Sequence, residues 1–301
     1  NTSGTLNVAV GAVALDANST GTANTAVGYN ALSASLTDGN TAVGKDAGEA
    51  LTTGGSNVAI GSNALATATT VAHNTAVGAD ALTANTSGGN GVAVGSQALV
   101  ANTTGGSNTA VGYAALTTNS TGGGNTAVGA AALDANTTAD GNTAVGVNAA
   151  SAVTTGASNT AVGQNALLLT STGTMNAAVG NHSLDANTTG SYNVAVGGNA
   201  LTANTTASNN VAVGYSALAA NTTGTDNVAV GDSAGDAVST GTDNTFIGDN
   251  AGGATTTASD NTAVGSSALL SNSTGASNVA IGAYALDAAT TANGNYAVGY
   301  N

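Results

Sequence analysis

Aspartate residues gather in one stretch of the sequence, and the chemistry that they could perform is the binding of a hard cation. They recur at intervals of 17 residues in two interleaved sets. Stacked carboxylates about 5 Å apart would repel one another, and calcium relieves such repulsion because it takes six to eight oxygen ligands. We therefore treat five residues as candidate calcium ligands: Asp226, Asp232, Asp243, Asp249 and Asp260.

The other acidic residues and the histidines form no comparable set. His73 and His182 are the only histidines and are far apart in the sequence, cysteine is absent, and no phosphate-binding glycine loop occurs. A nucleophile with a nearby general base is therefore not expected, and the sequence predicts a protein that is not an enzyme and requires no cofactor. Six acidic residues are spaced so that no two are close, as on a solvated face: Asp16, Glu49, Asp134, Asp185, Asp236 and Asp287.

One short repeat organises the whole chain. The pentapeptide Asn-Thr-Ala-Val-Gly, or a near copy, occurs 18 times, and its closing glycine returns every 17 residues except for one step of 16 between Gly28 and Gly44. Strict self-similarity at a short period predicts a solenoid. We expect one continuous β-solenoid domain over residues 1–301, without a linker and with about 18 coils.

Places in the repeat are numbered here from the asparagine of the pentapeptide. Place 1 is Asn in 17 of 18 copies, place 3 is Ala except at Phe246, place 4 is Val or Ile, and place 5 is Gly. Place 9 is Leu in 13 of 17 copies and place 14 is Thr in 16 of 17. Short Val- and Thr-rich runs with period-two alternation favour strands over helices. The sequence predicts an all-β fold of parallel coils about 4.8 Å apart, each with two or three short strands.

Each column of equivalent residues has an expected role. Places 2 and 4 share one face of the strand. The unbroken Val or Ile at place 4 predicts that this face points into the coil opposite Leu, so that Val128 is a core residue. Alanine at place 3 would allow rods to pack side by side, as in a trimer, or it would lie inside a narrow coil. We expect positive φ at the place-5 glycine, an amide ladder at place 1 and hydroxyl bonding at place 14. Asp38-Gly39 in the 16-residue copy should change one corner without breaking the stack.

Charge restricts the partners that the chain can bind. The net charge is −14, Lys45 is the only basic side chain, and 5% of the residues are charged. Nucleic acids and anionic membrane surfaces both select Lys and Arg, so neither is expected as a partner. No apolar run approaches the roughly 18–20 residues of a membrane span.

Three polar patterns each leave two interpretations open. The hydroxyl-rich turns suggest ice binding, but places 13 and 14 are adjacent, so their side chains should diverge, and place 2 mixes Thr with Val. Tyrosines at place 6 either pack at the coil corner or recognise a sugar or protein: Tyr29, Tyr113, Tyr215 and Tyr300. Asn-x-Ser/Thr sequences at place 12 are turn residues or glycan acceptors: Asn18, Asn85, Asn102, Asn119, Asn136, Asn187, Asn204, Asn221 and Asn272.

The stretch NTAVGYNALSAS at residues 24–35, with its copies along the chain, resembles two kinds of repeat. One is the head repeat of trimeric autotransporter adhesins, whose Asn/Ser-Val-Ala-Ile-Gly core forms a left-handed parallel β-roll. The other is the NTAVG-type array of tail-fibre-like bacterial and phage proteins. The adhesin head repeat is shorter than 17 residues, so its coil geometry need not apply here. The resemblance implies a fibrous surface appendage, often trimeric.

Together these patterns predict a structural, non-enzymatic segment of an extracellular fibre or cell-surface adhesin. We expect a stiff β-solenoid rod that associates with copies of itself, either end to end in a filament or as a homotrimer. A host surface or glycan is a further expected partner. The alternative is a phage tail-fibre shaft that binds a receptor, and an ice-binding solenoid is less favoured.

Overall fold

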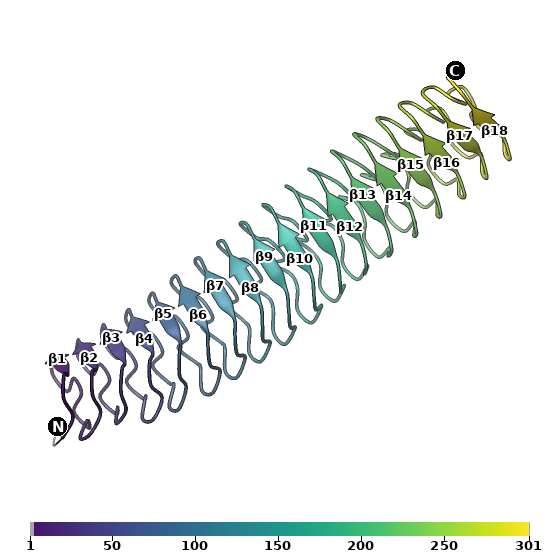
Figure 1. The fold of residues 1–301 in the computed structure, drawn as a ribbon. Coiled ribbons are helices and arrows are strands. Elements are labelled where there is room, and N and C mark those ends of the chain that lie inside the picture. Colours follow the sequence, from purple (N-terminus) through teal and green to yellow (C-terminus); the bar gives the residue numbers. More distant parts are fainter. Residues whose placement is uncertain (1–2, 301) are drawn as a thin grey trace. The chain divides into compact units, whose positions relative to one another are not determined.

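The fold is a parallel β-solenoid with a 17-residue repeat, as the sequence predicts. A computed structural model describes residues 3–300 and divides the chain into two compact units, residues 1–155 and 156–301. Each unit is a stack of coils in which every coil contributes one strand to a parallel sheet (Figure 1). That the two units form a single continuous domain stays a prediction.

The strands occupy places 2 to 4 of the repeat, and neighbouring strands pair in parallel with equal places side by side, as in Thr109↔Thr126. The first unit contains β1 (Val8–Val10), β2 (Thr25–Val27), β3 (Thr41–Val43), β4 (Val58–Ile60), β5 (Thr75–Val77), β6 (Val92–Val94), β7 (Thr109–Val111), β8 (Thr126–Val128) and β9 (Thr143–Val145). The second contains β10 (Thr160–Val162), β11 (Ala177–Val179), β12 (Val194–Val196), β13 (Val211–Val213), β14 (Val228–Val230), β15 (Thr245–Ile247), β16 (Thr262–Val264), β17 (Val279–Ile281) and β18 (Tyr296–Val298).

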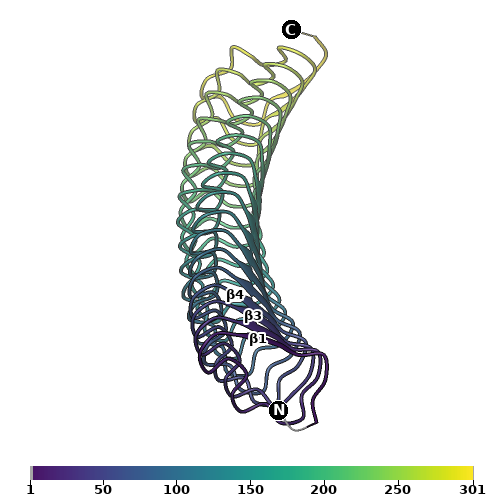
Figure 2. The ribbon, with the colours of Figure 1, turned by 90° about the vertical axis from the view of Figure 1, so that its left-hand side faces the viewer.

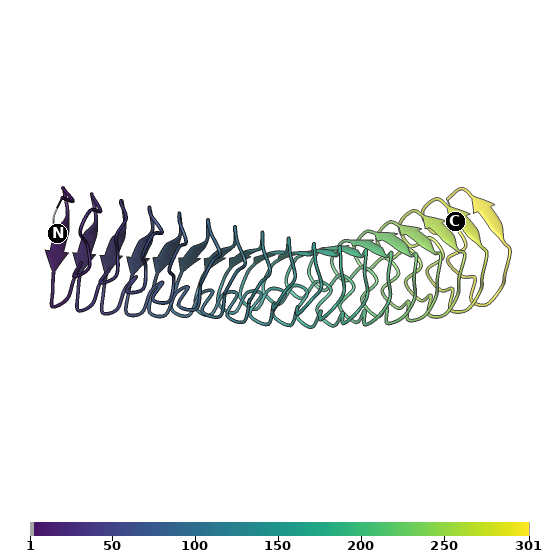
Figure 3. The same cartoon turned by 90° about the horizontal axis from the view of Figure 1, so that it is seen from below.

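Each coil has one strand and not the two or three that the sequence suggested. Turns close the coil on the side away from the strands (Figure 3). They still bond from coil to coil, as where the Leu116 N–H donates to the Ala132 carbonyl at 3.0 Å. Residues at places 7 and 9 have left-handed backbone, with φ of 56° at Ala114 and 53° at Leu116. This backbone interrupts a strand but turns the leucine side chain into the coil.

The strand faces are the reverse of the sequence prediction. Place 3 points into the coil and places 2 and 4 point out, so Ala127 has no exposed surface while Val128 is 37% exposed. The prediction that Val128 is a core residue is therefore wrong, as is the idea that alanine lies outside between rods. The interior is narrow, because buried Leu, Ala and Asn side chains from places 9, 8 and 1 already fill it. Only a methyl group fits beside them.

Phe246 is the one large residue at place 3, and the chain makes room for it with two glycines. A Cβ on Gly235 would lie 2.7 Å from the Phe246 ring, and one on Gly252 would lie 2.5 Å from it. Both glycines occupy place 9, where leucine is usual. The phenylalanine thus fills the volume that two leucines fill elsewhere, and its side chain is fully buried.

The place-5 glycine forms the corner after each strand, as predicted. Gly129 has φ of +140°, and a Cβ there would lie 2.3 Å from the Gly146 carbonyl oxygen of the next coil. Both the backbone conformation and the close approach of the next coil therefore require glycine.

The 16-residue copy changes only a turn, which confirms the expectation for Asp38 and Gly39. The strands β2 and β3 on either side of it pair in the usual register. The Asp38 carboxylate accepts the Thr22 N–H at 2.7 Å, and Gly39 takes φ of +73°. The coils of β3 and β4 follow that of β1 along the first unit (Figure 2).

The orientation of the strand can be tested with one substitution made at two adjacent residues. Ala127→Asp should bury an unpaired carboxylate and lower the free energy of unfolding by several kcal/mol. Val128→Asp places the same charge on the outer face and should cost no more than about 1 kcal/mol. Thermal or denaturant unfolding of the two variants measures the difference, and a larger cost at Val128 would restore the orientation expected from the sequence.

The packing around Phe246 predicts a strong coupling with place 9. Phe246→Ala alone should lower the free energy of unfolding by about 3–5 kcal/mol, because it leaves a cavity. Gly235→Leu with Gly252→Leu should also destabilise the parent, since both side chains would clash with the ring. Combining all three substitutions recreates the common repeat and should recover most of the loss. Additive costs in a denaturant series would contradict this packing.

Candidate functional surfaces

The outer side of each sheet is an exposed apolar surface. We name the outward side chains of places 2 and 4 the sheet face. Place 4 is Val or Ile in every coil, and many of these side chains are 36–40% exposed: Val43, Ile60, Val94, Val128, Val145, Val162, Val179, Val196, Val230, Ile247 and Ile281. Place 2 is mainly Thr or Val. Sequence reasoning paired these two columns correctly but placed them inside.

The structure separates the five candidate calcium ligands into two columns. Asp226, Asp243 and Asp260 lie at place 17, before the strands, while Asp232 and Asp249 lie at place 6, after them. All five are exposed. An extended chain rises about 3.3 Å per residue, so the six-residue separation across β14 places the two columns at most roughly 20 Å apart, on opposite ends of the strand.

One metal site built from all five residues is therefore not formed. Over residues 3–300, no three acidic or histidine side chains form a group that could hold a metal ion. Calcium binding by either column separately stays a prediction.

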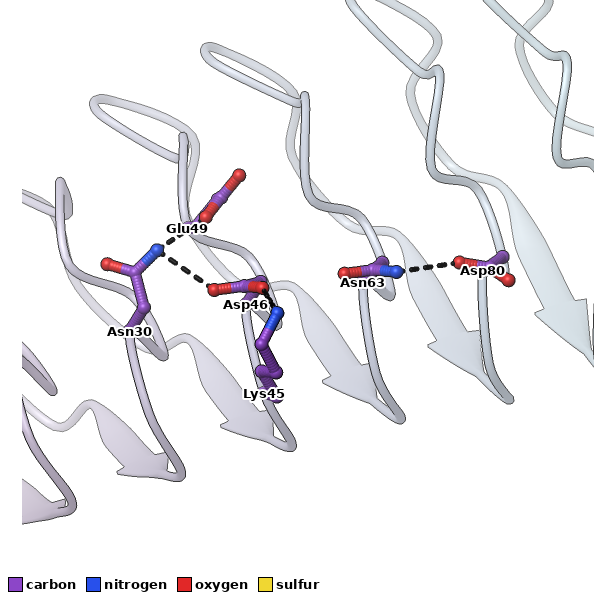
Figure 4. Close-up of polar contacts among 6 residues, drawn as sticks. All are labelled: Asn30, Lys45, Asp46, Glu49, Asn63 and Asp80. Carbon is purple, nitrogen blue, oxygen red and sulfur yellow. Dashed lines mark hydrogen bonds and ion pairs between the residues drawn. The ribbon is translucent and has the colours of Figure 1, made fainter.

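The only basic side chain is paired with a carboxylate adjacent to it in the sequence. Lys45 forms an ion pair with the neighbouring Asp46, and Asn30 of the preceding coil donates to Asp46 at 3.0 Å and also to Glu49. Figure 4 shows this group and, in the next two coils, the bond between Asn63 and Asp80 at 2.9 Å.

These contacts determine how the two partners titrate. Hydrogen bonding to Lys45, and then to Asn30, lowers the pKa of Asp46, and the same bond to Asp46 raises the pKa of Lys45. The described contacts thus commit this lysine to a carboxylate of its own chain.

His182 belongs to a polar group that spans three coils. Its Nδ1 lies 2.8 Å from the Asp185 carboxylate, whose other oxygen accepts the Thr202 hydroxyl at 2.8 Å. Its Nε2 lies 3.4 Å from the Asn165 amide. The neighbouring hydroxyl of Ser183 is buried and donates to the Gly180 carbonyl at 3.0 Å. The imidazole is therefore part of a hydrogen-bond network between coils, and the hydroxyl of the adjacent Ser183 is bonded to the backbone.

Asp134 and Asp236 depart from the solvated face predicted for place 10. Burial raises the pKa of each, and at Asp236 the charge of Asp232 adds to the effect. A carboxyl group with a raised pKa binds its proton more tightly in the folded chain than in the unfolded one. The stability that these two groups contribute is therefore greatest in acid and is lost as the pH rises through their folded pKa values.

The place-12 asparagines of the Asn-x-Ser/Thr sequences are interior residues. Asn119 has no exposed surface, and its amide donates both to the Gly122 carbonyl at 2.9 Å and to the Asn102 side-chain oxygen of the preceding coil at 2.9 Å. A glycan could not reach such an amide in the folded chain. The glycan-acceptor interpretation is therefore wrong for the folded state. The interpretation as turn residues is correct but incomplete, because these asparagines also form a hydrogen-bonded ladder inside the coil.

This ladder ends where the next coil carries an apolar residue at place 12. The side-chain oxygens of Asn136 and Asn221 are buried without a partner. Val153 and Val238 occupy the equivalent place one coil later.

A second buried ladder runs through place 1, as predicted, and it also closes each coil. Asn125 is fully buried, and its side-chain oxygen accepts the Asn142 N–H of the next coil at 2.9 Å. Its amide donates across the interior to the Ala139 carbonyl at place 15 of the same coil, at 2.8 Å. The bond across the coil was not expected from the sequence, since the place-15 carbonyl shows no side-chain pattern.

Hydroxyl groups bond from coil to coil chiefly at place 13. At place 14, where the sequence suggested them, the Thr20 hydroxyl donates to the Leu36 carbonyl of the next coil at 3.4 Å. The Thr103 hydroxyl donates to the Ser120 carbonyl at 2.9 Å, and Ser120 donates to Thr137 at 3.0 Å. Place 14 forms a separate exposed column of threonines, among them Thr121 and Thr138. The two neighbouring columns diverge, as expected.

All four place-6 tyrosines are more than half exposed: Tyr29 by 57%, Tyr113 by 62%, Tyr215 by 60% and Tyr300 by 77%. Packing alone therefore does not account for them. A Cβ on Gly198 of the preceding coil would lie 3.5 Å from the Tyr215 ring, and the Tyr300 ring packs edge-to-face against Tyr284 of the preceding coil.

The candidate surfaces of the described residues are thus the apolar sheet face, the threonine column at place 14 and the acidic residues in the turns. No helix within residues 3–300 is long and apolar enough to cross a membrane. No protein-family model and no curated protein sequence matches the chain.

The place-12 ladder predicts unequal costs for one substitution in adjacent coils. Asn119→Ala removes a donor to Asn102 and an acceptor for the Asn136 amide, which lies at 2.8 Å. Asn136→Ala also removes a donor, but it eliminates an oxygen that is already unpaired. We expect Asn119→Ala to lower the free energy of unfolding by about 1 kcal/mol more than Asn136→Ala does. Equal costs in denaturant unfolding would contradict the ladder.

Proposed function

We propose that this chain is a structural, non-enzymatic segment of an extracellular fibre or cell-surface adhesin. It acts as a stiff rod that associates with copies of itself. The observation that carries the proposal is the direction of the polar contacts. Backbone and side-chain groups at places 1, 2, 5, 9, 12 and 13 bond to the adjacent coil along the chain.

Stiffness follows from the number of these columns. A coil cannot tilt away from its neighbour without breaking strand bonds at places 2 and 5, amide bonds at places 1 and 12, and the hydroxyl bond at place 13. Two of these columns are buried, and a buried polar group that loses its partner is costly. Such a stack resists bending and transmits force, which is what a spacer in a fibre has to do.

The resemblance of NTAVGYNALSAS to adhesin-head and tail-fibre repeats supports a location outside the cell. A phage tail-fibre shaft that binds a receptor is the alternative. The exposed tyrosines at place 6 favour some recognition role in either setting, because an aromatic ring with a hydroxyl suits sugars and protein surfaces. A host glycan or surface is therefore a proposed partner.

Ice binding remains the rival function, and one observation favours it. Places 2 and 4 both point outward, two residues apart, which is the spacing that an ordered hydroxyl array needs. The columns nevertheless carry Val or Ile at place 4 and a mixture at place 2. An apolar face of this kind suits contact with protein better than hydrogen bonding to a lattice of water.

Modularity tests the rod directly. Deleting residues 108–124 removes one whole repeat and keeps every column in register, so the rod should shorten by about 5 Å and unfold at nearly the same temperature. Deleting residues 108–115 breaks the columns and should produce aggregation. Negative-stain microscopy with thermal unfolding measures both effects. Compact particles without rods, or equal damage from the two deletions, would contradict the proposal.

A further inference from the structure

The sheet face is exposed, largely apolar and free of charged residues. All fifteen acidic residues and the only lysine lie outside places 1 to 5. They occupy the turns at places 6, 7, 10, 16 and 17 and the shortened corner at Asp38. The molecule has a net charge of −14, yet a whole side of each sheet presents only Val, Ile, Thr, Ala and one Tyr.

We propose that the sheet face binds the sheet face of a second copy of the same chain, so that two solenoids pack side by side with their sheets facing each other. The inference rests on the proposed function, because it specifies how the copies in a fibre make contact. It differs from the end-to-end contact and from the trimer expected from the sequence.

Charge selects this face for contact between identical acidic chains. Two copies that meet through the turns would bring carboxylates together, which is unfavourable at low dielectric. Two copies that meet through the sheet faces keep the acidic residues at the borders, in water. The threonine column at place 14 is also uncharged, but its hydroxyls are well hydrated, so that covering it releases less free energy than covering Val and Ile.

Spacing selects another solenoid as the partner. The strands of each sheet repeat about every 4.8 Å, and paired sheets pack about 10 Å apart with their side chains interdigitated. A second copy carries the same β-branched residues at the same intervals, so the two faces match along their length. A globular partner would match only a few coils.

Area sets the expected strength of the contact. A strip about 10 Å wide over nine strands about 4.8 Å apart covers roughly 430 Å² of each copy. A stable interface covers about 800 Å² of each partner. The face of one unit therefore covers about half of what a stable interface needs, which predicts a weak pair. We expect association in the micromolar range.

Charge substitutions in three neighbouring coils test the proposal. Val94, Val111 and Val128 lie on the sheet face, whereas Thr104, Thr121 and Thr138 occupy place 14 of the same coils. Changing either set to Asp adds the same charge at the same levels of the stack. Analytical ultracentrifugation from about 1 to 100 μM at neutral pH should give the parent a mass approaching twice 27.8 kDa.

The place-4 set should weaken the dimer at least 100-fold, and the place-14 set should leave its dissociation constant unchanged within about twofold. A third variant, with the three valines changed to Thr, keeps shape and charge and should weaken the dimer about tenfold. Circular dichroism confirms that each variant is folded. If the aspartate variants do not fold, the valine-to-threonine variant still tests the proposal, because it adds no charge.

Several results would overturn the proposal. They are a parent that stays monomeric at 100 μM, a mass of three chains, equal losses from both aspartate sets, and ice shaping by a monomer that the place-4 set abolishes. Microscopy separates these failures from that of the proposed function. Rods that stay single would retain the structural role without this interface, whereas particles without rods would contradict both.

Discussion

The buried asparagine at place 1 is the interaction on which the rest of the fold depends. Its amide joins the start of the strand to the carbonyl at place 15 across the interior, as at Asn125 and Ala139, and its oxygen holds the N–H of the next coil. One side chain thus closes its own coil and sets the level of the next. Because these groups are buried, losing either bond would leave an unpaired polar group, which is costly.

The sequence predicted the fold class, the period, the parallel register, the corner glycine and the place-1 ladder, because each depends on the repeat itself. It could not give the orientation of the strand. Period-two alternation groups place 2 with place 4, but only the width of the interior decides which face enters it. Phe246 could have indicated that place 3 points inward. It is the one bulky residue at place 3, and it occurs where Gly235 and Gly252 replace the leucines of the interior.

The candidate sites were predicted less well, for a related reason. Asp226 and Asp232 are near in sequence, but β14 extends between them and separates their columns. The Asn-x-Ser/Thr sequences resemble surface turns, yet the backbone turns Asn119 inward. The strand faces are opposite to those predicted, so the place-4 valines point outward. These valines form the apolar sheet face from which self-association is proposed. Except at Phe246, the narrow interior admits only alanine at place 3, so places 2 and 4 point outward. The buried ladders that support the structural role and the outer face proposed as an interface both depend on this narrow interior.

Hydrogen exchange of asparagine side-chain amides, followed by NMR on protein labelled with ¹⁵N-asparagine, tests directly whether buried asparagine ladders hold the coils together. The account predicts a slow class from the buried places 1 and 12, such as Asn125 and Asn119, and a fast class from exposed residues such as Asn181. Assigning the slow class by single substitutions would locate it in the two columns. If all asparagine amides exchanged at the rate of free peptides in the folded protein, the ladders would not exist.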